Sequence, residues 1–167
     1  SPQQILAAFK NRIEEGIFGY ENQPESVKLS IKNWYEKRFN CELNSDWLQF
    51  TPTIMSSMAM ALDLFTKEGD AVIIQPPVYM EFSNTLKRTR RKNIENPLIL
   101  NELHYEMNFE ELALKASKGS VKALMICNPH NPGGRDWPKE ALTKFVKSYL
   151  KYKVLLLAAG CHAEISF

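Results

Sequence analysis

The run from Cys127 to Arg135, CNPHNPGGR, holds the residues whose types and spacing best suit chemistry. It follows an apolar, strand-like segment, Val121 to Ile126, and combines two Asn-Pro pairs with two glycines and a cation. Prolines hold an extended course, side-chain amides meet polar ligands, and glycines allow close approach of the backbone. The run therefore predicts a ligand-binding loop at the carboxyl end of a parallel strand. Such residues also mark β-to-α connections that touch no ligand, and the spacing alone leaves both interpretations open.

The elements that must position this loop alternate between strand and helix. The predicted strands are Trp47 to Thr51, Ala71 to Gln75, Lys92 to Glu95, Val121 to Cys127 and Val154 to Ala158. The predicted helices between and after them are Ile54 to Thr66, Val78 to Leu86, Phe109 to Lys118 and Lys139 to Tyr152. The later strands are apolar almost throughout, which is typical of strands covered by helices on both faces. The pattern predicts an α/β fold with a three-layer, mostly parallel sheet.

The first forty residues are predicted to form two helices, Pro2 to about Glu15 and Pro24 to about Phe39. Ser1 is expected to cap the first helix, and Gly16 to end it in a left-handed conformation. No repeat, linker or low-complexity tract interrupts the rest. We therefore expect an N-terminal helical segment, residues 1–45, followed by one α/β domain, residues 46–167.

Composition bounds the class of protein. The 167 residues are 44% hydrophobic and 24% charged, with a formal net charge of +2, which is typical of a soluble globular chain. No apolar run approaches the roughly 20 residues of a membrane span, and the amino terminus lacks the regions of a signal peptide. The cysteines, Cys41, Cys127 and Cys161, are odd in number and lack metal-ligand spacing. We expect a reducing, cytoplasmic setting with no membrane partner, and we interpret Cys161 as a buried thiol.

A run of cations, Lys87 to Lys92, places five positive charges in six residues. It could bind nucleic acid, but such runs are more often solvated loops, and no interleaved aromatic residues or nucleic-acid motif accompany it. We expect no nucleic-acid partner, and a nucleic-acid-binding module is the third hypothesis for function.

Segments along nearly the whole chain resemble one family in the right order. Besides the loop at 127–135 they are GIFGY at 16–20, FTP at 50–52, FTKEGD at 65–70, QPPVY at 75–79 and ENPL at 95–98. The family is that of fold type I pyridoxal-phosphate enzymes, in the aminotransferase class I and II superfamily, and in particular its cystathionine β-lyase and carbon-sulfur lyase branch. The resemblance implies that the chain is part of the large domain of such an enzyme. It also implies pyridoxal 5'-phosphate as cofactor, a small amino acid as substrate, and a homodimer.

The resemblance assigns cofactor-binding positions. The turn from Pro52 to Ser56 would hold the phosphate on the backbone N–H groups of a helix start, because these carry partial positive charge. The residues implied are Thr53, Ile54 and Met55 at the phosphate, Tyr79 stacked on the pyridine ring, Asn131 donating to the phenolic oxygen, His162 as a hydrogen-bonding side chain, and Tyr20 reaching the phosphate of the partner subunit. Arg135 is expected to fix the loop, and a capped helix start or a core tyrosine would be the plainer interpretation of Thr53 or Tyr79.

The sequence differs from the family pattern at two positions that matter for catalysis. Alignment on His162 puts Ala159 at the place where the family has the aspartate that pairs with the pyridinium nitrogen, and a methyl group cannot hold that charge. The Schiff-base lysine of the family has no counterpart here, so no catalytic residue is assigned. Members of the family are roughly twice this length or more, so we expect a truncated chain that is inactive alone.

The leading hypothesis for function is therefore a partial pyridoxal-phosphate-dependent carbon-sulfur β-lyase acting on cystathionine or cysteine conjugates. An aminotransferase shares the same motifs and stays open as an alternative. A catalytically inactive remnant without the Schiff-base lysine is the other alternative. The motifs leave the exact substrate undefined.

Overall fold

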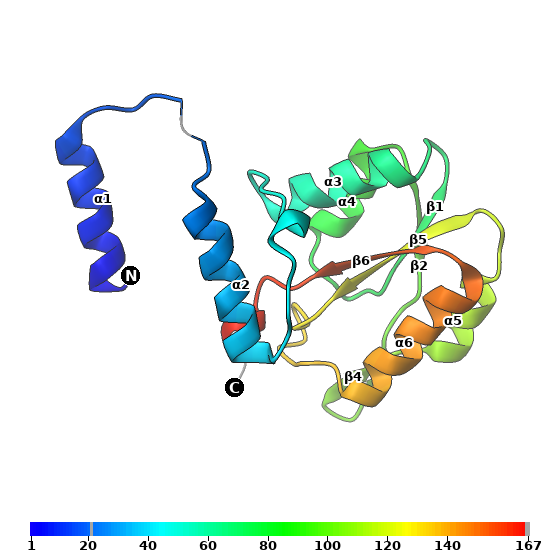
Figure 1. Ribbon diagram of the computed structural model, residues 1–167. Helices are drawn as coiled ribbons and strands as arrows, with labels where there is room; N and C mark the ends of the chain where they lie inside the picture. The colour runs from blue at the N-terminus through cyan, green and yellow to red at the C-terminus, as the bar shows by residue number, and fades with distance from the viewer. Residues whose placement is uncertain (21, 166–167) are drawn as a thin grey trace. The chain divides into compact units, whose positions relative to one another are not determined.

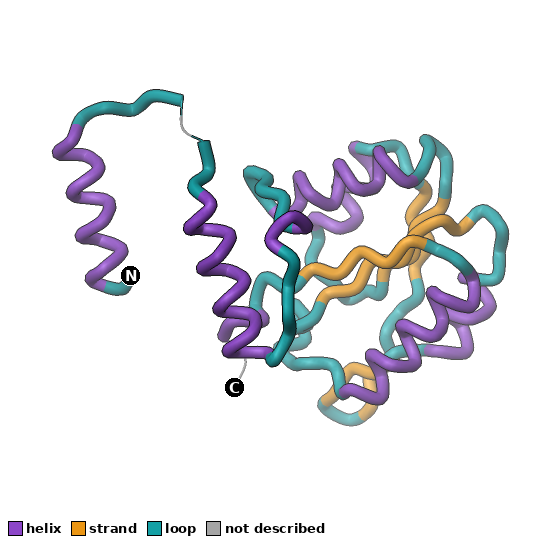
Figure 2. The backbone as a smooth tube through the Cα atoms, in the orientation of Figure 1, coloured by secondary structure: helices purple, strands orange, loops and turns teal. Residues whose placement is uncertain are grey.

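The computed structural model describes residues 1–20 and 22–165. The chain divides into two compact units, Ser1–Phe50 and Thr51–Phe167. Figure 1 labels helices and strands of both units, and Figure 2 colours helices, strands and loops separately.

The first unit is helical. It contains α1, Gln3–Glu15, α2, Glu25–Phe39, and a short 3-10 helix, η1, Ser45–Trp47. Gly16 ends α1 with a φ of 69°, which confirms the predicted left-handed cap. The predicted cap by Ser1 is wrong, because Pro2 holds the N-cap position and no side chain caps the helix. The predicted strand at 47–51 is also wrong: the Asn44 side chain accepts a hydrogen bond from the Asp46 N–H at 2.9 Å and starts η1 instead.

The second unit contains a four-stranded sheet in the order β2-β1-β5-β6, with all strands parallel. The strands are β1, Ala71–Ile74, β2, Lys92–Glu95, β5, Val121–Cys127, and β6, Leu155–Ala159. Each lies at or within one residue of its predicted bounds. Since all four run the same way, their carboxyl ends meet at one edge of the sheet.

Helices cover both faces of this sheet (Figure 1). Val72 and Ile74 of β1 pack with residues of α3, Ile54–Phe65, and α4, Glu81–Arg88. Their neighbours Ala71 and Ile73 pack on the opposite side with α5, Phe109–Ala116, and α6, Lys139–Tyr152. Side chains alternate along a strand, so each strand contributes to both cores. The predicted three-layer, mostly parallel α/β architecture is confirmed.

Three local features were not predicted. A small antiparallel hairpin joins β3, Ile99–Asn101, to β4, His104–Glu106, and a 3-10 helix, η2, spans Ala163–Ile165. The helix α4 begins at Glu81 rather than Val78, with Met80 at the N-cap position. No helix among the described residues is both long enough and apolar enough to cross a bilayer.

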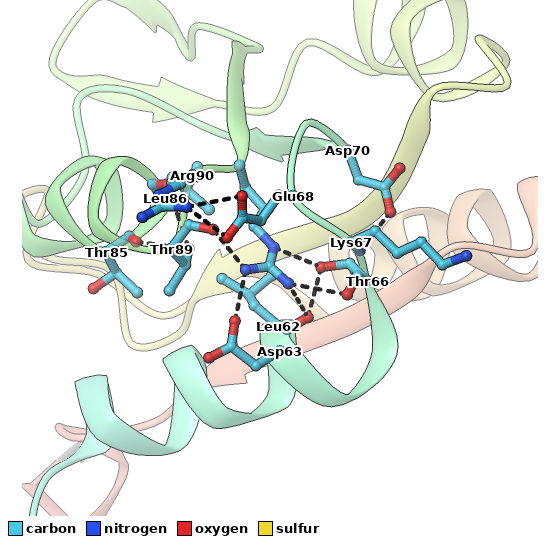
Figure 3. Close-up of polar contacts among 11 residues, drawn as sticks. Leu62, Asp63, Thr66, Lys67, Glu68, Asp70, Thr85, Leu86, Thr89 and Arg90 are labelled. Atoms are coloured by element: carbon cyan, nitrogen blue, oxygen red, sulfur yellow. Dashed lines mark hydrogen bonds and ion pairs between the residues drawn. The ribbon is translucent and has the colours of Figure 1, made fainter.

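One cation of the run at 87–92 is built into the fold, while Lys87, Arg88, Arg90 and Lys92 are exposed. Arg91 is buried, and its guanidinium donates to the carbonyl oxygens of Leu62 and Thr66 at 3.0 and 2.9 Å, at the end of α3. It also forms an ion pair of 2.6 Å with Asp63. Arg90 contacts both carboxylate oxygens of Glu68, and Figure 3 shows these groups gathered around the end of α3. Two of the five cations that suggested nucleic acid thus contact the end of α3 or the turn that follows it.

Candidate functional site

A pocket of about 370 Å³ lies where the carboxyl ends of β5 and β6 meet the start of α3. The described residues that line it are Thr53, Ile54, Met55, Tyr79, Phe82, Cys127, Asn131, Ala159, Cys161 and His162. Parallel sheets place ligand sites at this edge, because the connections that follow the strands gather there. Six of the seven cofactor-binding residues that the resemblance implied lie on this pocket.

The amino terminus of α3 presents backbone N–H groups to the pocket. Thr53 caps the helix, since its hydroxyl oxygen accepts from the Ser56 N–H at 3.0 Å, and its carbonyl accepts from the Ser57 N–H at 3.1 Å. Among the described residues, the N–H groups of Ile54 and Met55 have no hydrogen-bond acceptor, as expected for the first turn of a helix. Two donors at the positive end of a helix are suited to an anion such as a phosphate. The cap by Thr53 is confirmed, and it leaves these two N–H groups available to an anion.

Tyr79 and Asn131 come from two different connections. Tyr79 lies just before α4 and lines the pocket, and because it is 41% exposed it is no core tyrosine. Asn131 lies in the loop after β5 and is half-buried. His162 is exposed, just beyond β6. A flat ring, an amide and an imidazole around one pocket can hold a planar ligand with polar substituents.

The loop after β5 is held by residues that the sequence reasoning missed. Trp137 is buried, and its indole N–H donates to the Cys127 carbonyl at 3.0 Å. Its backbone N–H donates to the side-chain oxygen of Asn128 at 3.0 Å. Asn128 is thus a structural residue. Arg135 donates to the Tyr105 carbonyl at 2.9 Å and lies 5.4 Å from the centre of the Trp137 ring, which supports the loop-fixing role expected of it. The sequence feature that could have revealed the role of Trp137 is its position directly before Pro138, where α6 starts.

His130 lies buried inside the same loop. Its ring packs against Trp137 and Tyr105, with ring centroids 5.1 and 6.4 Å apart. Burial lowers the pKa of His130, with Arg135 adding to the shift and the Pro77 carbonyl opposing it. Neither ring nitrogen makes a hydrogen bond of ordinary geometry within the described part of the chain. The neutral imidazole therefore acts as a packing group.

Three of the described lining residues, Phe82, Cys127 and Ala159, are buried, and we call them the bottom of the pocket. Ala159, the last residue of β6, is 3% exposed and packs in the core with α3 and α4. Cys127 is buried, and burial raises the pKa of its thiol, with the Asn131 backbone N–H opposing the rise. Cys161 is exposed and lines the pocket, so its interpretation as a buried thiol is wrong: it follows Gly160, beyond the end of the strand. None of the described lining residues is an acid or a lysine.

Tyr20 belongs to the other unit. It lies between α1 and α2 and is fully exposed.

The doubly covered parallel sheet, with a pocket at its carboxyl edge and a helix start beside it, is part of the large-domain fold of the fold type I transferases, as superposition on solved structures shows. The sequence profile of the family "Aminotransferase class I and II" matches residues 2–167. The chain belongs to this family.

Its relatives include lyases and aminotransferases. It is 34% identical over 165 residues to cystathionine beta-lyase PatB of Bacillus subtilis, covering 99% of this chain and 43% of the relative. It superposes with a TM-score of 0.89 and 33% identity on cystalysin from Treponema denticola, whose crystal structure contains pyridoxal 5'-phosphate, covering 94% of this chain and 40% of cystalysin. An aspartate aminotransferase from Sulfurisphaera tokodaii is 25% identical over 158 residues, covering 93% of this chain and 39% of that enzyme. The chain thus spans about two fifths of the length of these relatives.

Proposed function

We propose that this chain supplies the cofactor cradle of a pyridoxal-phosphate-dependent enzyme that cleaves a carbon-sulfur bond in cystathionine or a cysteine-like amino acid. Residues 46–167 would form part of the cofactor-binding large domain, and residues 1–45 an N-terminal helical segment. The observation that carries the proposal is the pocket itself, where Thr53, Tyr79 and Asn131 line one cavity at the carboxyl edge. The similarity to cystathionine β-lyases and a C-S lyase supports the reaction.

The pocket fits most of the cofactor. The free N–H groups of Ile54 and Met55 would hold the phosphate, the Tyr79 ring would lie against the pyridine face, and His162 would add a polar contact. Asn131 would donate from its amide to the phenolic oxygen. By the alignment on His162, Ala159 would stand at the ring-nitrogen end, and only this end of the cofactor would lack a matching group. When bound, pyridoxal phosphate supplies an electron-withdrawing ring that stabilises negative charge on the α-carbon of an amino acid.

The residues of this chain would bind and orient, and we assign none of them to the chemical step. Capping by Thr53 keeps the first turn of α3 formed, and the anchored loop keeps Asn131 in place. The apolar bottom of the pocket excludes water from the ring, which strengthens polar contacts at its rim.

The proposal also includes an oligomeric state and a cellular location. We propose a homodimer in which Tyr20 reaches the phosphate of the partner's site, as the resemblance implies. Three cysteines without a disulfide among them support a cytoplasmic setting.

An aminotransferase is the alternative reaction, favoured by the family profile and by aminotransferases among the similar proteins. A catalytically inactive cofactor-binding protein is the second alternative, and Ala159 in place of an acid favours it.

The phosphate contact is tested by replacing Ile54. Proline suits the first position of a helix but has no N–H, and Thr53 already has the extended backbone that precedes proline (φ −148°, ψ 159°). Ile54→Pro should therefore keep α3 and weaken pyridoxal-phosphate binding by about tenfold or more, measured by absorbance titration of the 167-residue chain. Ile54→Ala, which keeps the N–H, is the matched control, and pyridoxal without phosphate should bind both variants equally. Equal phosphate-ester affinity for the two variants would overturn the assignment.

The reaction is tested on the protein as its source cell makes it. With L-cystathionine and no 2-oxo acid, we expect pyruvate, ammonia and a thiol. Product formation that requires a 2-oxo acid acceptor would establish the aminotransferase instead. Pyridoxal-phosphate binding with neither product, and with no lysine trapped by borohydride, would establish the inactive alternative.

A further inference from the structure

The pocket has an unusual charge balance for a site that we propose to hold a pyridine ring. Its polar side chains are hydroxyl, amide, thiol and imidazole groups, and its bottom is formed by Ala159, Cys127 and Phe82. No carboxylate stands among the described residues that line it. A protonated ring nitrogen needs an anion close by when it leaves water, because desolvation disfavours the charged form.

Ala159 is fixed in this position by the sheet. Its carbonyl accepts from the Asn128 N–H at 3.0 Å, and it pairs with Cys127 of the neighbouring strand. Its side chain is 3% exposed, within the core that includes Met58 and Phe82. The backbone next to the ring-nitrogen end is therefore rigid, and no nearby side chain of the lining replaces the missing acid.

We infer that Ala159 makes the pocket select the uncharged form of its ring, so that the ring nitrogen of the bound cofactor contributes nothing to affinity. The inference rests on the proposed function. It predicts that a carbon analogue of pyridoxal phosphate, in which a C–H group replaces the ring nitrogen, binds as well as pyridoxal phosphate itself. Affinity would come from the phosphate, the ring face and the phenolic oxygen, all of which the analogue keeps.

The test measures the dissociation constants of both ligands for the unmodified 167-residue chain at neutral pH. We expect values within about twofold of one another. A preference for pyridoxal phosphate of about tenfold or more would overturn the inference and leave the proposed cradle standing. Binding of neither ligand would overturn the proposed function and the inference with it.

A pair of variants sharpens this comparison. Ala159→Asp should restore a preference for pyridoxal phosphate over the carbon analogue by about tenfold or more, since a carboxylate can then pair with a protonated nitrogen. Ala158→Asp places the same charge on the neighbouring, exposed residue of β6 and should leave the two affinities equal. The ¹⁵N chemical shift of ring-labelled pyridoxal phosphate gives a second readout, with the neutral form expected in the unmodified chain. A protonated form there would contradict the inference even if Ala159→Asp failed to fold.

Discussion

At the scale of single residues, the loop after β5 depends on a neutral histidine. His130 is buried against Trp137, and burial lowers its pKa below the ordinary value. Above about pH 6.5 the ring is neutral in both the folded and the unfolded chain, so it adds no pH dependence. As the pH falls below that value, the unfolded chain takes up a proton that the folded chain resists. The free energy of unfolding should therefore decrease, by at most about 1.4 kcal/mol per pH unit from this group.

Urea denaturation at about pH 7.5 and about pH 5 checks this expectation. His130→Phe keeps an aromatic ring and should lose part of the acid-induced decrease, whereas His104→Gln, at an exposed position of β4, should keep all of it. The same pH dependence in all three proteins would contradict a role for His130.

Gly133 is required by close packing. A Cβ built there would overlap Nδ1 of His130, whose ring cannot move away because Trp137 and Tyr105 hold it. Gly133→Ala should lower the free energy of unfolding by about 1–3 kcal/mol and weaken ligand binding at Asn131. Gly119→Ala meets no atom within 4 Å and serves as the control in the same thermal melts. Equal melting of the two variants would show that the loop can adjust.

Some residues of the pocket and its loop could be predicted from the sequence, and others could not. The resemblance implied that Thr53, Tyr79, Asn131 and His162 surround one ligand, and all four line one pocket. Three of them, Tyr79, Asn131 and His162, follow parallel strands, whose carboxyl ends share one edge. Trp137 could not be predicted, since its role depends on a hydrogen bond across ten residues to Cys127. The exposure of Cys161 was also hidden, because it depends on exactly where β6 ends.

At the scale of elements, one arginine joins the end of α3 to the strand β2 beside it. Arg91→Ala would remove the guanidinium donor of the buried Thr66 carbonyl and its contacts with Asp63 and the Thr66 hydroxyl. The Leu62 carbonyl would lose one donor and keep those of the Thr66 N–H and hydroxyl. We expect a loss of about 2–4 kcal/mol in the free energy of unfolding, measured by urea denaturation. Arg88→Ala, which removes an exposed ion pair with Glu81, should cost about 1 kcal/mol or less. A smaller effect at Arg91 than at Arg88 would refute this structural role.

Long apolar elements were predictable, and short polar ones were not. β5 and α6 have their predicted bounds, because strong periodicity and burial agree over their lengths. The hairpin of β3 and β4 has strands of three residues, too short for a pattern to emerge. The strand expected at 47–51 is absent: Asn44 starts a 3-10 helix that includes Trp47, and residues 48–51 pair with no strand.

At the scale of the whole molecule, the apolar face of α1 predicts self-association. Ile5, Leu6, Phe9 and Ile13 are all about half or more exposed, and α1 buries no residue. The 167-residue chain should therefore sediment as species larger than its 19.2 kDa monomer, in a concentration-dependent way. Phe9→Lys with Ile13→Lys should shift the distribution toward monomer, whereas Asn11→Lys should not. A monodisperse monomer at all concentrations would contradict the expectation.

In this parallel sheet, the residues on which folding depends are largely different from those that line the pocket. Most of its stabilising contacts lie between the strands and the helices that cover them, while much of the pocket wall lies in the connections beyond the strand ends. Cellular quality control responds to unfolding and does not sense a missing charge at position 159, where alanine packs well. A lineage can therefore change or abandon the chemistry at this edge while its protein persists at normal abundance, and only selection on metabolism would remove the change.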